Sequence, residues 1–157
     1  RIRDAANTGP TDGAIGLNVT AVNDAPTATN LTQTKSYTEG ATSVALDDIV
    51  VSDVDTGETI TATVTLSPAT TGTLTTSGTA TFTSGTGVWT VTGSVTAVNT
   101  ALAAVAFTPA TDNDLAATLT TRVRDAANTG PADGTISLNV TAVNDAPTAT
   151  NLTQNQS

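Results

Sequence analysis

Acidic side chains are the residues of this sequence whose types and spacing could do chemistry. The chain carries 14 Asp and Glu residues and contains no His and no Cys. Asp53 and Asp55 stand two positions apart in the string SDVDTGE, and Asp112 and Asp114 repeat that spacing in TDND. In an extended segment, side chains two positions apart point to the same side. Paired carboxylates near amide and carbonyl oxygens suit calcium, which takes about six to eight oxygen ligands; magnesium, which retains its waters, is the weaker candidate.

Other oxygen-bearing side chains accompany these two pairs. The further candidate metal ligands are Asn23, Asp24, Glu39, Asp125, Asn144 and Asp145. A competing interpretation is that single acids serve turns, because Asp and Asn side chains satisfy nearby backbone groups. That interpretation is favoured for Asp12 and Asp133, each of which precedes a glycine, whereas Asp47 and Asp48 are expected to be solvated.

The composition argues against several classes of protein. Without His and Cys, zinc, thiolate and Ser-His chemistry lose their usual groups. A net charge of -9 with only five basic residues is a poor match for a phosphate backbone, so we expect no nucleic-acid partner. Asp53 and Asp55 could be interpreted as the carboxylate pair of a glycosidase. Aromatic residues that would form a sugar-binding platform are only 3% of the chain, so we expect no enzyme. No apolar run is long enough to cross a bilayer, so no direct membrane insertion is expected.

The sequence repeats itself at an offset of 121 positions. Residues 1–33 match residues 122–154 at 29 of 33 positions, and the four exceptions are Ile2/Val123, Thr11/Ala132, Ala14/Thr135 and Gly16/Ser137. A period of this size exceeds that of solenoid repeats and equals that of a domain. We therefore expect a window on a tandem array. Its parts would be the C-terminal hairpin of a preceding repeat (1–22), one complete repeat (23–143), and a linker with the start of the next repeat (144–157).

Alternating β-branched and small residues predict an all-β fold. The segments 58–67, 87–93, 115–125 and 134–143 alternate with a period of two, which is typical of strands with one buried face. Val98, Leu102 and Val105 recur at helical spacing, so a short helix is expected before a strand at Phe107. The Asp12-Gly13 and Asp133-Gly134 pairs predict tight hairpins. Short strands separated by turns favour a β-sandwich.

Two strings in the sequence resemble those of cadherin repeats. TAVNDAP resembles the cadherin linker, and VSDVDTGE resembles the cadherin Asp-x-Asp loop with its glycine. Glu39 stands where cadherins carry a glutamate, and RVRD resembles their late strand-end aspartate. The resemblance covers residues 23–145. It is closer still to the cadherin-like repeats of giant bacterial surface adhesins exported by type I secretion with RTX tails, which are Thr-rich, acidic and Cys-free.

The resemblance implies an immunoglobulin-like Greek-key sandwich and two junctions that each bind calcium. At the first, Asn23 would join Asp53, Asp55 and Asp125, while Asp24 would face ligands of the preceding domain. At the second, Asp145 would join Glu39, Asp112 and Asp114, while Asn144 would face the next domain. The linker departs from the family where Ala21 and Ala142 replace an Asp and where Ala25 and Ala146 replace an Asn. Fewer ions per linker are therefore expected.

The expected function is mechanical. Calcium would stiffen the joints between neighbouring repeats of one chain, which would extend an adhesive tip from the surface of a bacterium that secretes the protein. One alternative is a self-assembling filament or surface-layer subunit, and another is an ice- or carbohydrate-binding module that presents Thr-x-Thr strings. Because residues 1–22 nearly duplicate residues 122–143, hairpin exchange between copies is also expected.

Overall fold

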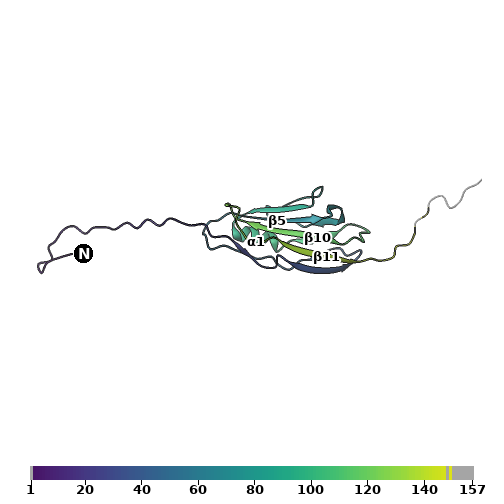
Figure 1. Ribbon diagram of the computed structural model, residues 1–157, viewed down its shortest axis with the longest axis horizontal. Helices are drawn as coiled ribbons and strands as arrows, with labels where there is room; N and C mark the ends of the chain where they lie inside the picture. Colours follow the sequence, from purple (N-terminus) through teal and green to yellow (C-terminus); the bar gives the residue numbers. More distant parts are fainter. Residues whose placement is uncertain (1, 148, 150–157) are drawn as a thin grey trace, which may run out of the picture.

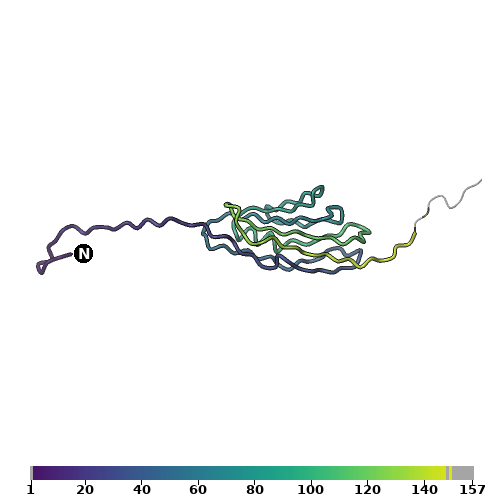
Figure 2. Tube along the Cα trace, in the orientation of Figure 1, coloured from purple at the N-terminus to yellow at the C-terminus, as the bar shows by residue number. Residues whose placement is uncertain are grey.

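The computed structural model describes residues 2–147 and 149. An elongated β-sandwich occupies the middle of the molecule, and an extended segment leaves it at each end (Figures 1 and 2). The N-terminal segment leaves from one end of the sandwich and the C-terminal segment from the other, so the chain enters and exits along one axis. The predicted all-β fold is confirmed, whereas the tandem array stays a prediction.

The larger layer is a six-stranded sheet with the order β2-β11-β10-β5-β8-β7. Its strands are β2 (Gln33–Thr38), β5 (Ile60–Ser67), β7 (Thr81–Thr83), β8 (Val88–Gly93), β10 (Ala117–Arg124) and β11 (Gly134–Thr141). Neighbouring strands are antiparallel except β2 and β11, which run parallel with Ile136 beside Gln33. Every second residue of β5 from Ile60 to Leu66 is buried, and β10 alternates in the same way. The predicted strands therefore exist, each with one face in the core.

The second layer consists of short elements. A three-stranded sheet has the order β3 (Val44–Ala45), β9 (Ala106–Pro109) and β6 (Gly72–Leu74), and β1 (Thr27–Ala28) pairs with β4 (Val51–Ser52). A 3-10 turn, η1 (Ala69–Thr71), precedes β6. Trp89 and Phe107 are fully buried between the layers, and the Trp89 indole donates a 3.0 Å hydrogen bond to the carbonyl of Thr75. Two large aromatic side chains thus fill a core built mainly from small aliphatic ones.

The predicted short helix is present as α1 (Val95–Leu102). Ser94 caps it by accepting a hydrogen bond from the amide of Ala97, as N-cap serines do. Val98 and Leu102 are buried, and the helix ends before Val105, which is buried in the turn that leads to β9. The side-chain amide of Asn99 bonds both the N–H and the C=O of Val51, so the helix holds β4 in place.

The tight hairpin predicted at Asp133-Gly134 is wrong. β10 ends at Arg124 and β11 begins at Gly134, so the connection is the loop 125–133. Gly134 is required for another reason: a Cβ on it would lie 2.2 Å from the carbonyl oxygen of Leu31. Asp133 instead forms an ion pair with Arg124.

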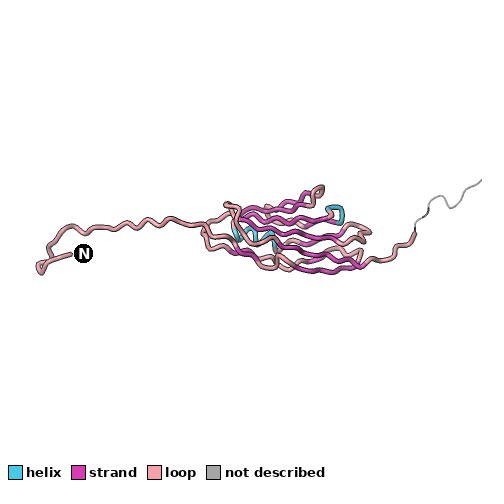
Figure 3. Tube along the Cα trace, viewed as in Figure 1, coloured by secondary structure: helices cyan, strands magenta, loops and turns pink. Residues whose placement is uncertain are grey.

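The N-terminal copy of this sequence is not part of the sandwich. Residues 2–25 form no strand, and the hairpin predicted at Asp12-Gly13 is absent from them (Figure 3). Their assignment to a preceding repeat stays a prediction. Of the predicted next segment, 144–157, the structure describes residues 144–147 and 149 without regular structure, and the rest lies outside the described residues. No helix in the described part of the chain has the length and apolarity needed to cross a membrane.

Candidate metal centres

The first cluster lies where the N-terminal segment meets the sandwich. β1 pairs with β4 so that Thr27 lies beside Ser52, which brings the linker next to the loop that begins at Asp53. β10 ends at the same place, and Asp125 follows its last residue. Three segments distant in sequence therefore meet at one end of the sandwich, namely the linker, residues 53–58 and the loop after β10.

Direct hydrogen bonds join these segments. The amide of Asn23 donates to Oδ2 of Asp125 at 2.9 Å, and the backbone N–H of Asp24 donates to Oδ2 of Asp55 at 2.8 Å. The N–H of Asp55 in turn donates to Oδ1 of Asp53 at 2.9 Å. Four of the five predicted ligands at this end are thus linked through their side chains, and Asp24 takes part through its backbone.

One oxygen of this cluster has no partner. Oδ2 of Asp53 is buried and accepts no hydrogen bond within the described part of the chain. Burying a carboxylate oxygen without a partner is costly, and a bound cation is one of the few groups that offsets this cost. Two pockets adjoin the cluster. One of about 390 Å³ is lined by Asp53 and one of about 340 Å³ by Asn23, and Asp55 and Glu58 line both. The donor set is all oxygen, so it fits a hard cation such as calcium.

Asp125 is the most strongly held acid of this cluster. It is 5% exposed, and it accepts hydrogen bonds from the Asn23 amide and from both the hydroxyl and the N–H of Thr129. The bond from Asn23, followed by those from Thr129, holds the pKa of the Asp125 carboxyl below its usual value of 3.8, because hydrogen bonds to the ionised form favour it. Contact between the linker and Asp125 therefore favours the ionised form of this carboxyl.

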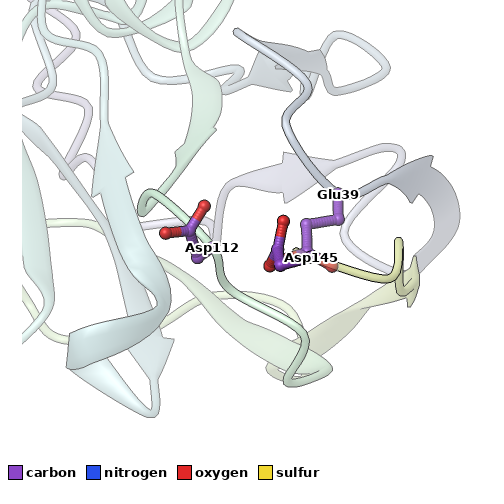
Figure 4. A group of neighbouring side chains, drawn as sticks. All are labelled: Glu39, Asp112 and Asp145. Atoms are coloured by element: carbon purple, nitrogen blue, oxygen red, sulfur yellow. The ribbon is translucent and has the colours of Figure 1, made fainter. Parts of the chain in front are cut away.

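The second cluster lies at the opposite end of the sandwich. Carboxylate oxygens of Glu39, Asp112 and Asp145 all lie within 4.8 Å of one another (Figure 4). Glu39 follows β2 and Asp145 follows β11. Because these two strands run parallel, both deliver their acids to the same end. Oε2 of Glu39 accepts a 2.8 Å hydrogen bond from the N–H of Val143, which fixes the second linker against the sandwich.

Asp114 is not brought into this group. Asp112 has a φ of 54°, so the TDND string is a turn rather than the extended segment expected from its spacing. Asn113 between the two acids is buried, and its amide donates to the hydroxyl of Tyr37 at 3.1 Å and to the carbonyl of Leu115 at 2.9 Å. This anchor turns Asp112 toward Glu39 and leaves Asp114 exposed outside the cluster.

Asn144 is the remaining predicted ligand. Its amide donates to the carbonyl of Asp145 at 3.3 Å, as the amide of Asn23 does to the carbonyl of Asp24 at 3.3 Å. The two linkers therefore share a local conformation. Asn23 has in addition the partner Asp125, whereas Asn144 bonds no side chain of a residue that the structure describes.

Sequence reasoning missed two residues. Glu58 accepts a hydrogen bond from the N–H of Ala126 at 3.3 Å and faces the first cluster. Its position in the same string as Asp53 and Asp55 was a usable signal. Asn113 orients Asp112 from the core, and the sequence carries no signal for that, because an Asn beside two acids is equally expected in an ordinary exposed turn.

The acids interpreted as turn or solvated residues behave differently from the clustered ones. Asp47 pairs with Lys35, Asp133 with Arg124 and Asp12 with Arg3. Among residues 2–147 and 149, no salt bridge involves an acid of either cluster. Within this part of the chain, the carboxylates of Asp53, Asp55, Asp125 and Glu39 accept hydrogen bonds instead.

Comparison of the chain with protein-family models, curated proteins and solved structures gives no match, so the geometry of the two clusters is what bears on function.

Proposed function

We propose that this chain is an extender repeat of a long bacterial surface adhesin, in which calcium stiffens the joints between successive domains. One observation carries the proposal: the same Asn-Asp linker pair ends in an oxygen cluster at each of the two opposite ends of one sandwich. At the first end the linker contributes Asn23, and at the second it contributes Asp145. A linker placed between two such sandwiches would offer its Asn to one domain and its Asp to the other.

The electrostatics of the clusters explain why a cation would stiffen the joint. Two carboxylates about 4 Å apart repel one another by about 1 kcal/mol in water and by more where the dielectric is lower. In the second cluster, three carboxylates approach within 4.8 Å, and no cationic side chain of the described residues pairs with them. A divalent cation converts this repulsion into attraction and holds the linker, the loop and the strand end together. Without the ion, the linkers are held by hydrogen bonds such as those to Asp125 and Glu39, and the repulsion between carboxylates opposes that contact.

The proposal implies a location outside the cell. Extracellular modules of this kind bind calcium with dissociation constants of about 10⁻⁴ to 10⁻³ M, and such sites fill in seawater or tissue fluid but not in cytosol. The partners would be the neighbouring repeats of the same chain.

Calorimetric titration of calcium into the 157-residue chain tests the proposal, together with thermal unfolding in chelator and in millimolar calcium. The expected result is saturable binding and a higher Tm with calcium, because an ion that binds only the folded state stabilises it. Asp53→Asn with Asp112→Asn, one substitution in each cluster, should weaken calcium binding and reduce the rise in Tm.

The matched control is Asp47→Asn with Asp133→Asn, which removes the same charge from acids that pair with Lys35 and Arg124. It should retain the calcium response. If the wild-type chain takes up no calcium, or if both double variants respond equally, the clusters are not calcium sites and the proposal is wrong.

A second candidate, a self-assembling filament, is favoured by one observation. Ile15, Leu17 and Val19 are each at least 88% exposed on an extended segment. Alternating exposed apolar residues are a template for pairing with another chain.

A further inference from the structure

The exposed N-terminal segment is a second copy of a strand that the sandwich buries. Residues 13–20 match β11, residues 134–141, except at Ala14/Thr135 and Gly16/Ser137. Ile136 and Leu138 of β11 are fully buried, while their counterparts Ile15 and Leu17 are 90% and 88% exposed. The same apolar side chains are thus present twice, once in the core and once in solvent.

The differences between the two copies fall where β11 tolerates them. Thr135 is exposed and Ser137 is half-buried, so replacing them by Ala and Gly removes no core side chain. The position of β11 with the strictest steric requirement, Gly134, is a glycine in both copies. A Cβ at position 134 would lie 2.2 Å from the carbonyl oxygen of Leu31, whereas a Cβ at Gly13 would meet nothing within 4 Å. Gly13 meets a steric requirement that exists only in the β11 position.

The loop that precedes each copy has the same local structure. The N–H of Asp4 donates to the carbonyl of Thr8 at 2.8 Å, and the N–H of Asp125 donates to the carbonyl of Thr129 at 3.0 Å. The ion pair between Arg3 and Asp12 likewise repeats the pair between Arg124 and Asp133. The N-terminal loop forms these contacts outside any sheet, so it would present residues 13–20 in the conformation that leads into β11.

We propose that a second copy of this chain accepts residues 13–20 in place of its own β11, so that copies join head to tail. In the accepting sandwich the donated Ile15 and Leu17 would occupy the positions of Ile136 and Leu138, between β10 and β2. Domain swapping of this kind exchanges identical elements between protomers.

The exchange would also bring two half-sites together, the cluster around Asp125 in one copy and the cluster around Glu39 in the other. The donor's linker would leave the acceptor as residues 142–145 do, with Val22 and Asp24 in the positions of Val143 and Asp145. Asp24 would then face Glu39 and Asp112 of the acceptor, while Asn23 keeps its bond to Asp125 of the donor. One linker would bind both sandwiches.

The protein concentration, compared with the effective concentration of a copy's own β11, determines whether copies exchange strands or stay separate. Exchange between two intact copies buries one strand and releases another with the same Ile, Leu and Val side chains, so the buried apolar area hardly changes. The strand of a copy's own chain is present at an effective concentration of about millimolar. A chain whose own β11 cannot enter the core would therefore accept the donated strand far more readily than an intact one.

Four forms of the full 157-residue chain test the proposal in chelator, so that the result does not depend on calcium binding. The form with Ile136→Asp and Leu138→Asp disables β11. The form with Ile15→Asp and Leu17→Asp disables the donor. The third form carries all four substitutions, and the fourth is wild type. Trp89, the only tryptophan and fully buried, reports folding by its fluorescence, and light scattering reports mass.

The β11-disabled form is expected to show a buried Trp89 and a mass of two or more copies, with a Tm that rises with concentration. The four-substitution form should show an exposed Trp89 at every concentration, and the donor-disabled form should be a folded monomer. The proposal is wrong if the β11-disabled form has an exposed Trp89 at every concentration, or if it folds as a monomer.

Discussion

The side-chain amide of Asn23 lies 2.9 Å from Oδ2 of Asp125, a residue 102 positions away in the chain. This hydrogen bond ties the linker before the sandwich to the loop after β10. Its counterpart at the other end is absent, because Asn144 bonds only the backbone of Asp145 among the described residues. The two linkers can therefore be compared directly: Asn23 has a distant side-chain partner, whereas Asn144 has none among the described residues.

Replacing Asn23 should raise the pKa of Asp125. The amide of Asn23 is the largest cause of the lowered pKa, so Asn23→Ala should move it toward 3.8. The carboxyl carbon chemical shift of Asp125, followed by NMR across acidic pH, measures this change. Asn144→Ala is the matched control and should leave the pKa of Asp125 unchanged. Equal pKa values in wild type and Asn23→Ala would show that the linker is not docked in solution.

The lowered pKa of Asp125 also predicts a pH dependence of stability. A carboxyl whose folded pKa is depressed stabilises the fold at pH values above its unfolded pKa and loses that contribution as pH falls through the folded pKa. The free energy of unfolding should therefore fall as pH drops below about 3.8, and it should fall less in Asp125→Asn. Urea unfolding at several pH values measures how the free energy of unfolding depends on pH in wild type and in Asp125→Asn.

Asp4 supplies the control for that measurement. Hydrogen bonds from Thr8 lower the pKa of Asp4 in the N-terminal copy of the same loop, which lies outside the sandwich. Asp4→Asn should leave the pH dependence of sandwich unfolding as it is in wild type. If Asp4→Asn and Asp125→Asn change the slope equally, the effect comes from the loop itself rather than from the fold.

The repeat provides a matched pair for the core as well. Leu138→Ala should reduce the free energy of unfolding by about 2–5 kcal/mol, because it opens a cavity under β11. Leu17→Ala removes the same atoms from an exposed side chain and should change the free energy of unfolding by less than about 0.5 kcal/mol. Chemical denaturation followed by Trp89 fluorescence compares them. A large cost for Leu17→Ala would mean that residues 13–20 are already buried in solution.

Period-two patterns predicted the strands that bury one face over many residues, such as β5 and β10, because burial there selects every second side chain. β1, β3 and β4 were not predicted, because two residues carry no period. These strands depend on distant partners, as β4 does on the amide of Asn99. The parallel pairing of β2 with β11 is equally nonlocal, although it brings Glu39 and Asp145 together.

The composition of the candidate site could be read from the sequence better than its geometry. The acids of both clusters stand in recognisable strings, and three of the four expected at the second cluster meet there. The exception, Asp114, follows from the positive φ of Asp112 and the buried amide of Asn113. The amide of Asn113 bonds the hydroxyl of Tyr37, a residue 76 positions away, and spacing within TDND cannot express such a contact.

Gly134 should be intolerant of any side chain, and Gly13 should accept one. Gly134→Ala places a Cβ 2.2 Å from the backbone oxygen of Leu31, which cannot move without shifting the segment before β2. Overpacking of this kind costs about 1–3 kcal/mol. Gly13→Ala should leave the free energy of unfolding of the monomer unchanged, since nothing lies within 4 Å. In the β11-disabled form, by contrast, Gly13→Ala should lower the mass measured by light scattering.

Asp112 and Asp114 should differ in their effect on calcium, although they stand two positions apart. Asp112→Asn removes an oxygen charge from the group formed with Glu39 and Asp145, and fewer charged ligands weaken a calcium site. We expect a loss in affinity of roughly tenfold, or about 1.4 kcal/mol. Asp114→Asn removes the same charge from an exposed side chain outside the group and should bind almost as wild type does. Calorimetric titration in a background of Asp53→Asn isolates the second cluster. Equal losses would mean that overall charge, rather than the geometry set by Asn113, attracts the ion.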